Sequence, residues 1–125
     1  MSYKEPRRFT CFTKQLDDLK ARYPHSSAEI DRQLNAILDN PDCGDRIPRC
    51  KGFHLRKQRI LLAYYGISKA NGGRVIFMRL EENKTIVMIA IHLKKDWPEE
   101  KKLAKHIEKC IKDIEIEIKE SDPLP

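Results

Sequence analysis

Apolar residues recur at helical spacing in two segments near the start of the chain. In the first, Leu16, Leu19 and Tyr23 follow Thr13, whose hydroxyl suits a helix N-cap, and Pro24 ends the pattern. The second follows Ser26 and Ser27 and carries one apolar stripe made of Ile30, Leu34, Ile37 and Leu38. The spacing predicts two helices that form a hairpin with a turn of about three or four residues.

Strand patterns flank this pair of helices. Residues 7–12, with Phe9, Cys11 and Phe12 apolar, predict a first strand. Residues 40–52 contain two prolines and two glycines and predict a loop. Residues 53–67 have the β-branched and aromatic content of a strand, so the adjacent Tyr64 and Tyr65 are expected on its opposite sides.

The second half of the chain is richer in strand signals. After a turn over 68–73, residues 74–80 alternate, with Val75, Phe77 and Arg79 on one side. A turn over 82–84 leads into residues 85–93, whose nearly continuous apolar run predicts the most buried strand. The last helix is expected from Pro98, with an apolar stripe of Leu103, Ile107, Cys110, Ile111 and Ile114. Residues 114–119 also alternate, which leaves a change to strand open there.

These elements predict an α+β fold, with a small, mainly antiparallel sheet, an N-terminal helical hairpin on one face and a C-terminal helix. A length of 125 residues fits one domain over 1–125, with a loose tail over 119–125. No apolar run approaches the roughly 18 residues that span a bilayer, and the charged start has no secretory signal, so we expect a cytoplasmic protein without a membrane partner.

Charge is distributed unevenly along the chain. The net charge is +6, yet residues 46–80 contain no Asp or Glu, and they carry Arg46, Arg49, Lys51, Arg56, Lys57, Arg59, Lys69, Arg74 and Arg79. A solvated face normally mixes both signs of charge. One interpretation is a basic face that pairs with acidic helices elsewhere in the chain. The other, which we favour, is a surface that binds the phosphates of a nucleic acid.

The four cysteines, at 11, 43, 50 and 110, contain no C-x-x-C pair, so reduced thiols are expected rather than a disulfide framework. Cys43, Cys50 and His54 lack the spacing and the fourth ligand of a zinc site. We therefore expect no metal and no cofactor.

Short basic motifs follow one another in a defined order. Residues 56–59 read R-K-Q-R, residues 66–77 read G-I-S-K-A-N-G-G-R-V-I-F, and residues 91–96 read I-H-L-K-K-D. This order resembles the RelE/ParE superfamily of bacterial toxins, most closely the HigB-like branch of RelE toxins. That branch has R-K-x-R, then G-x-G-K-x-G-G-x-R-V-I-Y, then an apolar strand ending in Y-x-K-N-E. The resemblance covers roughly residues 9–112.

The resemblance implies a toxin of a type II toxin–antitoxin system. Such a protein is a ribosome-dependent mRNA endonuclease (an mRNA interferase) that inhibits translation, works without a metal, and is held inactive by a cognate antitoxin. The substrate 2′-hydroxyl attacks the adjacent phosphate, which requires a base, a cation over the phosphate oxygens and an acid. By motif position, the implied catalytic residues are Arg74, His92, Lys94 and Arg59. The candidate RNA-binding residues are the basic Arg56, Lys57, Lys69, Arg79 and Lys95, together with Tyr65, whose ring is suited to stack on a base.

Two other functions are compatible with the residues. The first is an inactive RelE-fold module that binds RNA or protein, and it is favoured by Phe77, which replaces the pattern's Tyr. The second is a ParE-like gyrase poison, which the clustered cations disfavour because gyrase inhibition does not need them.

Arg74 is expected to be exposed, so that its loss would spare the fold. His92 ends an apolar strand and is interpreted either as a core residue or as a proton carrier that titrates near 6.5. We expect Arg56, Lys57, Arg59, Arg74 and Lys94 on one connected surface.

Overall fold

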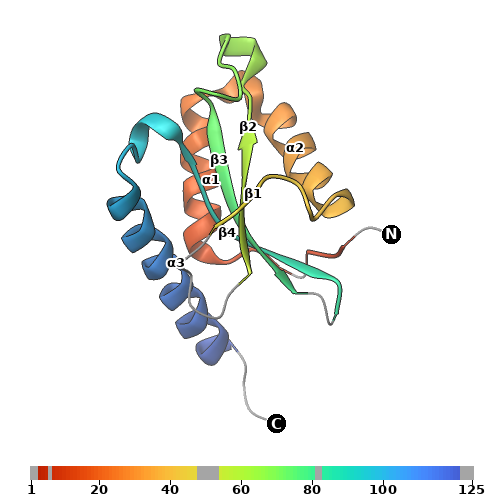
Figure 1. Ribbon diagram of the computed structural model, residues 1–125, viewed down its shortest axis with the longest axis vertical. Coiled ribbons are helices and arrows are strands. Elements are labelled where there is room, and N and C mark those ends of the chain that lie inside the picture. The colour runs from red at the N-terminus through yellow and green to blue at the C-terminus, as the bar shows by residue number, and fades with distance from the viewer. Residues whose placement is uncertain (1–2, 6, 48–53, 81–82, 122–125) are drawn as a thin grey trace.

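An antiparallel sheet lies between helices in this α+β protein (Figure 1). The computed structural model describes residues 3–5, 7–47, 54–80 and 83–121. The helices are α1 (Thr10–Arg22), α2 (Ser27–Asp39) and α3 (Glu100–Ser121), and the strands are β1 (Asp45–Arg46), β2 (Leu55–Ile60), β3 (Gly73–Leu80) and β4 (Thr85–Leu93). The strands are hydrogen-bonded in the order β1-β2-β3-β4, and every pair is antiparallel, as the short connections predict.

Both faces of the sheet are buried, which explains why β4 is apolar at almost every position. One face, called here the α1–α2 face, packs in a cluster that includes Phe12, Leu16, Ile30, Leu34, Val75, Phe77, Met88 and Ile91. The opposite α3 face packs in a cluster that includes Leu55, Ile76, Ile89, Ala90, Ile107, Cys110, Ile111 and Ile114. The alternation predicted for β3 is therefore confirmed, because Val75 and Phe77 lie on one face and Ile76 on the other.

A register shift divides β4 into two parts. Ile76 pairs with Ala90, whereas its neighbour Phe77 pairs with Met88, so Ile89 has no partner of its own on β3. This β-bulge places Ile89 and Ala90, which are consecutive, on the same α3 face. Every side chain after the bulge therefore faces the side opposite to the one that an uninterrupted strand would give it.

Residues 7–12 do not form the predicted strand. Thr10 already begins α1, and the N-cap position is occupied by Phe9, which has no side-chain acceptor. The acceptor comes instead from α3, where the Glu117 carboxylate receives hydrogen bonds from the backbone N–H of Thr10 (3.0 Å) and from its hydroxyl (3.0 Å). These hydrogen bonds, with help from Arg7, lower the pKa of Glu117. A cap 107 residues away in the sequence leaves no local signal for the start of the helix.

The outer edge of β4 is covered near both of its ends. Lys4 forms a parallel bridge with Thr85, so the N-terminal segment runs along the start of the strand. Further along, the backbone N–H of Ile91 donates to Oε1 of Gln15 on α1 at 2.9 Å. Some of the backbone groups that an edge strand would leave exposed, those near its two ends, therefore have partners within the chain.

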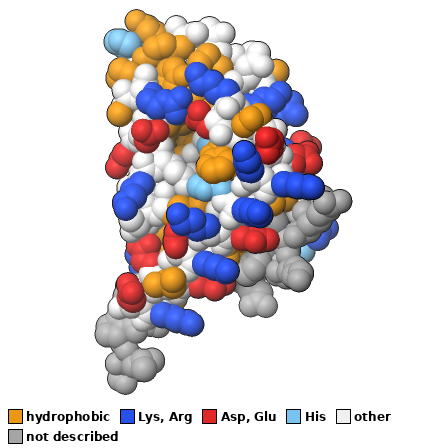
Figure 2. Space-filling view, turned by 90° about the vertical axis from the view of Figure 1, so that its left-hand side faces the viewer, with side chains coloured by type: hydrophobic (Ala, Val, Ile, Leu, Met, Phe, Trp, Pro, Cys, Tyr) orange, Lys and Arg blue, Asp and Glu red, His pale blue; other side chains and the backbone are white. Residues whose placement is uncertain are grey.

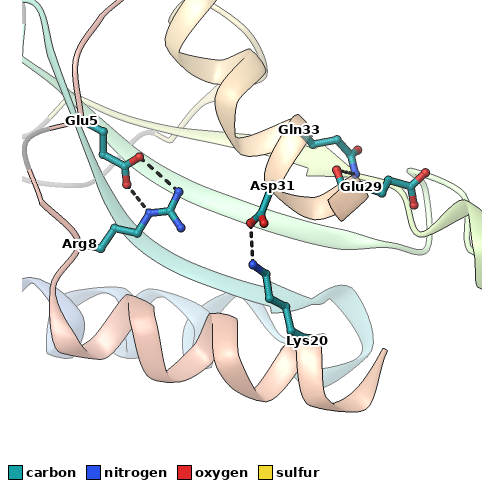
Figure 3. A network of polar contacts seen from close by, with 6 residues as sticks. All are labelled: Glu5, Arg8, Lys20, Glu29, Asp31 and Gln33. Atoms are coloured by element: carbon teal, nitrogen blue, oxygen red, sulfur yellow. Dashed lines mark hydrogen bonds and ion pairs between the residues drawn. The ribbon is translucent and has the colours of Figure 1, made fainter. Parts of the chain in front are cut away.

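An ion pair connects α1 to α2 (Figure 3), and side-chain hydrogen bonds connect α2 to the segment after β2. Nζ of Lys20 on α1 lies 2.7 Å from Asp31 on α2. Gln33 forms hydrogen bonds with both the N–H and the carbonyl of Leu61, and Glu29 accepts from the N–H of Ala63. Both helices are present as predicted, but Thr13, the predicted N-cap, lies inside α1, which begins at Thr10. Both helices contribute to the same core cluster. Packing of the two helices on each other as a hairpin is not shown.

Three other expectations require correction. The strand predicted over 53–67 ends at Ile60, and a 3-10 turn follows over Ala63–Tyr65, so Tyr64 and Tyr65 do not alternate across a sheet. The loop predicted over 40–52 contains the short strand β1, and residues 48–53 lie outside the described residues. Residues 114–121 continue α3 rather than forming a strand or a loose tail, and 122–125 are not described.

Two glycines in the connection from β2 to β3 offer a matched pair of substitutions. A Cβ on Gly72 would overlap the backbone carbonyl oxygen of Ile60, whereas a Cβ on Gly66 would meet no atom within 4 Å. Gly66 has a φ of +68°, so its substitution brings only backbone strain. We expect Gly72→Ala to lower the free energy of unfolding by about 3 kcal/mol and Gly66→Ala by about 1 kcal/mol. Urea unfolding measures both, and equal losses would contradict this packing.

Candidate functional site

Three of the residues singled out from the sequence form a row across the sheet. Arg59 on β2 pairs in register with Arg74 on β3, and Arg74 pairs with His92 on β4. Their side chains lie on the α3 face, since Leu55 and Ile76, at even spacing from Arg59 and Arg74, belong to the cluster on that face. The bulge at Ile89 gives His92 this orientation.

Arg74 is buried, with 6% of its surface exposed, in contrast to the exposed position expected from the sequence. Its Nη1 atom donates to the carbonyls of Lys69 (3.0 Å) and Gly73 (3.0 Å), and its Nη2 atom donates to the carbonyl of Ala70 (3.0 Å). The guanidinium therefore closes the turn that leads into β3. Burial, and after it the charge of Arg59, lower the pKa of Arg74, which still carries its charge at neutral pH.

His92 is also buried, at 6% exposure, and its Nδ1 atom has no hydrogen-bond partner among the described residues. Burial is the main cause that lowers the pKa of His92 to about 4, and the neighbouring charges of His106 and Arg74 act in the same direction. The imidazole is consequently neutral at pH 7. The titration near 6.5 expected from the sequence is wrong for this environment.

The segment between β4 and α3, together with α3 itself, supplies neighbours that sequence reasoning did not assign to the site. The ring of His106 stacks on Trp97, with 4.5 Å between ring centroids, and burial lowers the pKa of His106. Asp96 is the acidic group that acts on His92, and its carboxylate is bound to Arg22 at 3.0 Å. In the sequence, His106 is next to Ile107, which belongs to the apolar stripe of the last helix. This position indicates only that His106 lies near the core, not that it is a neighbour of His92.

Lysines extend the positive charge around the row. Lys57 is half-buried and lies two residues before Arg59 on β2, so both side chains are on the α3 face. Its positive charge helps to lower the pKa of His92. Lys94 is exposed directly after β4, and its backbone N–H donates to the carbonyl of Gly72, so it adjoins the turn closed by Arg74. Lys69 and Lys95 are exposed in the turn and in the 3-10 segment after β4.

Other predicted residues lie elsewhere, because alternation along a strand divides the basic stretch between two faces. Arg56 lies on the α1–α2 face and donates to the carbonyls of Asp42, Cys43 and Gly44. Arg79 is on that face as well, bound to the Tyr3 hydroxyl and the Asp42 carboxylate. The expectation that Arg56 shares one surface with Lys57, Arg59, Arg74 and Lys94 is therefore wrong.

Tyr65 is likewise separate from the row. It packs against the core of the α1–α2 face, its ring lies edge-on to Tyr23 at 5.0 Å, and its hydroxyl accepts a hydrogen bond from the backbone N–H of His25. Figure 2, which faces the side where α3 lies in Figure 1, shows Lys and Arg side chains among Asp and Glu side chains. The acid-free stretch of sequence does not produce an acid-free face on this side.

The row combines groups suited to binding an anion. The row itself contains two arginines and His92, and Lys57 and His106 lie close to it. Both histidines have lowered pKa values, and the charge of the nearby Asp96 is balanced by Arg22. A bound phosphate would be attracted by the cations and would favour protonation of the histidines. Among the described residues no cluster of three or more His, Cys, Asp or Glu side chains is placed to hold a metal ion, and Cys50 lies outside them.

Comparison of the chain with protein-family models, with characterised proteins and with solved structures found no match. In the described part of the chain, no helix is both long and apolar enough to cross a membrane.

The lowered pKa of His92 makes stability depend on pH in a defined direction. Because His92 titrates near 6.5 when unfolded and at about 4 when folded, the unfolded chain binds the additional proton between these values. The contribution, about 3 kcal/mol, is complete above pH 6.5 and is lost as the pH falls toward 4. Urea unfolding at pH 7 and pH 4.5 should show a smaller loss in His92→Gln than in the parent protein.

The control for this pH effect is Glu108→Gln, at an exposed position of α3, which should lose as much stability on acidification as the parent protein. An NMR titration of the His92 ring that gives a pKa near 6.5 would refute the burial argument.

Arg74 and its cross-strand neighbour Arg59 should differ in their effect on stability. Arg74→Ala removes charged donors from three carbonyls and is expected to lower the free energy of unfolding by about 3 kcal/mol. Arg59→Ala, at an exposed position, should change it by less than about 0.5 kcal/mol. Urea midpoints of the two variants provide the measurement, and a fully stable Arg74→Ala would contradict the structural role.

Proposed function

We propose that this protein is a RelE-like, ribosome-dependent mRNA endonuclease, the toxin of a type II toxin–antitoxin pair. The observation that carries the proposal is the row of Arg59, Arg74 and His92 across one face of an antiparallel sheet. The row brings together residues from three separate motifs of the sequence resemblance. Lys57 and Lys94 lie beside it and supply further cations for an RNA backbone.

Each residue has a distinct part in the proposed reaction. The 2′-oxygen of the substrate attacks the adjacent phosphorus, the bond from phosphorus to the 5′-oxygen breaks, and a cyclic phosphate and a 5′-hydroxyl result. The exposed guanidinium of Arg59 contacts the phosphate oxygens, where negative charge increases in the transition state. Neutral His92 accepts the proton of the 2′-hydroxyl, and the Lys94 ammonium donates one to the leaving oxygen.

Arg74 supports this chemistry mainly as a positioning residue. Its donors are occupied by the carbonyls of Lys69, Gly73 and Ala70, so it fixes the turn beside the site and contributes a buried positive charge. Phe77, where the family pattern has Tyr, is fully buried on the α1–α2 face. A hydroxyl at that position would point away from the row, so its absence does not weaken the proposed site.

The proposed partners follow from charge. With a net charge of +6, the protein is suited to the ribosome and to mRNA, and to a cognate antitoxin whose acidic amphipathic helix covers the basic residues. Opposite charges accelerate such an association, and salt weakens it. Action in the cytoplasm belongs to the same proposal.

A second candidate function is RNA binding without cleavage. The observation in its favour is that His92 is only 6% exposed and that the Nη atoms of Arg74 are engaged within the chain. In this case the exposed Arg59 and its neighbours would bind phosphates, and the row would perform no proton transfer.

Cleavage of ribosome-bound mRNA by the purified protein tests the proposal. The parent protein should cut, and His92→Gln should reduce the single-turnover rate on the order of 10²-fold, because one proton acceptor is lost. The double variant Lys57→Ala/Arg59→Ala should bind single-stranded RNA more weakly, with a salt slope smaller in magnitude by about 1.4, or 0.7 for each lost contact.

The matched control removes the same charge elsewhere. Arg32→Ala/Lys119→Ala deletes two exposed cations from α2 and α3, away from the row, and should leave the salt slope nearly unchanged. Salt-dependent binding without any cleavage would favour the second candidate function. Equal losses in the two double variants would remove the row as the RNA-binding site.

A further inference from the structure

Two cysteines that are 99 positions apart in the sequence meet between α1 and α3. Sγ of Cys11 lies 2.7 Å from Sγ of Cys110, and both cysteines are free thiols. A disulfide bond has a sulfur–sulfur distance of about 2.05 Å, so bond formation needs an approach of only about 0.7 Å. Two helices that are already in contact can provide this without a change of fold.

Gln15 holds the two sulfur atoms in place. Its Nε2 atom donates to Sγ of Cys11 at 3.2 Å and to Sγ of Cys110 at 3.4 Å. The other end of the same amide accepts from the backbone N–H of Ile91 on β4 at 2.9 Å, which fixes its orientation. The sulfur pair is therefore anchored to the sheet as well as to the two helices.

Cys11 of this pair can be reached from solvent on one side. A groove between α1 and α3 is lined by Cys11, Lys14, Gln15, Lys109, Asp113 and Ile116. Cys11 is half-buried at this groove, whereas Cys110 is fully buried beneath it. A small oxidant that enters the groove would thus encounter Cys11 first.

We propose that Cys11 and Cys110 are a redox-active dithiol that forms an intramolecular disulfide and so locks α3 to α1. This inference is independent of the proposed function. With glutathione disulfide as the oxidant, the Cys11 thiolate attacks one glutathione sulfur and releases the first glutathione. Cys110 then loses its proton and attacks Sγ of Cys11, which releases the second glutathione. One dithiol is oxidised and one glutathione disulfide is reduced to two glutathione molecules.

The different surroundings of the two thiols agree with this order of events. Burial, together with the contact to Cys11, raises the pKa of Cys110 to about 12, so at neutral pH it remains a thiol and reacts poorly with a molecule in solution. Its attack on Cys11 is intramolecular, and the short distance compensates for the small fraction of thiolate.

The bond would close a loop that contains most of the chain. A cross-link between positions 99 apart restricts the unfolded chain strongly. In the folded protein, the bond would also join α1 to α3 through Cys110, which is part of the core cluster on the α3 face. Oxidation is therefore expected to raise the melting temperature on the order of 10 °C, and reduction should reverse the change.

The test uses the full chain with Cys43→Ser and Cys50→Ser, which leaves Cys11 and Cys110 as its only thiols. Native protein is incubated with glutathione disulfide, and the products are identified by peptide mass mapping without reduction. We expect a linked peptide pair, a loss of about 2 Da, and a melting temperature that dithiothreitol restores to its starting value.

Two further variants make the result specific. Cys11→Ser should form no cross-link, and Cys110→Ala should stop at the mixed disulfide of Cys11 with glutathione. If the parent dithiol also stops at this mixed disulfide, or if both thiols stay unreacted until the protein is unfolded, the proposal is wrong. A cross-link that leaves the melting temperature unchanged would overturn the proposed locking of the helices.

Discussion

One additional residue in β4 determines which side chains meet on the α3 face. The bulge places Ile89 and Ala90 on the same face, so the positions after them exchange sides relative to a regular strand. Ile91 and Leu93 consequently enter the core on the α1–α2 face, and His92 comes to lie beside Arg74. Without the bulge, His92 would point into that core, and the row of polar residues would end at β3. The candidate site thus depends on backbone register rather than on any contact of its own.

The parts of the fold that the sequence predicts well are those whose signal is local and periodic. α2, β3 and α3 follow apolar stripes or alternation, and the apolar run of β4 indicates burial on both faces. The start of α1 is different, because Glu117 provides its cap from the far end of the chain. Lacking a local cap, Phe9 and its neighbours resemble a short strand. The two-residue strand β1 has no hydrophobic pattern at all, so only pairing with β2 reveals it.

The candidate site is predictable from sequence only as a set of residue types. The motifs identify Arg59, Arg74 and His92, but their common row depends on pairing between strands. Alternation sends Arg56 and Arg79 to the opposite face, which the total charge of the stretch conceals. The sequence pattern also does not show that the polar side chains of His92 and Arg74 are buried, and this burial keeps His92 neutral while Arg74 binds backbone carbonyls.

The coverage of the β4 edge affects how this sheet can meet other chains. A free edge strand offers an unpaired row of N–H and C=O groups that another strand can join, which leads to aggregation or to recognition by strand addition. Here Lys4 and Gln15 occupy positions along one edge, and the opposite edge described by the structure is the short, charged pair Asp45–Arg46. Fewer backbone groups along β4 are therefore free to pair with a strand of another chain than in an uncovered edge strand.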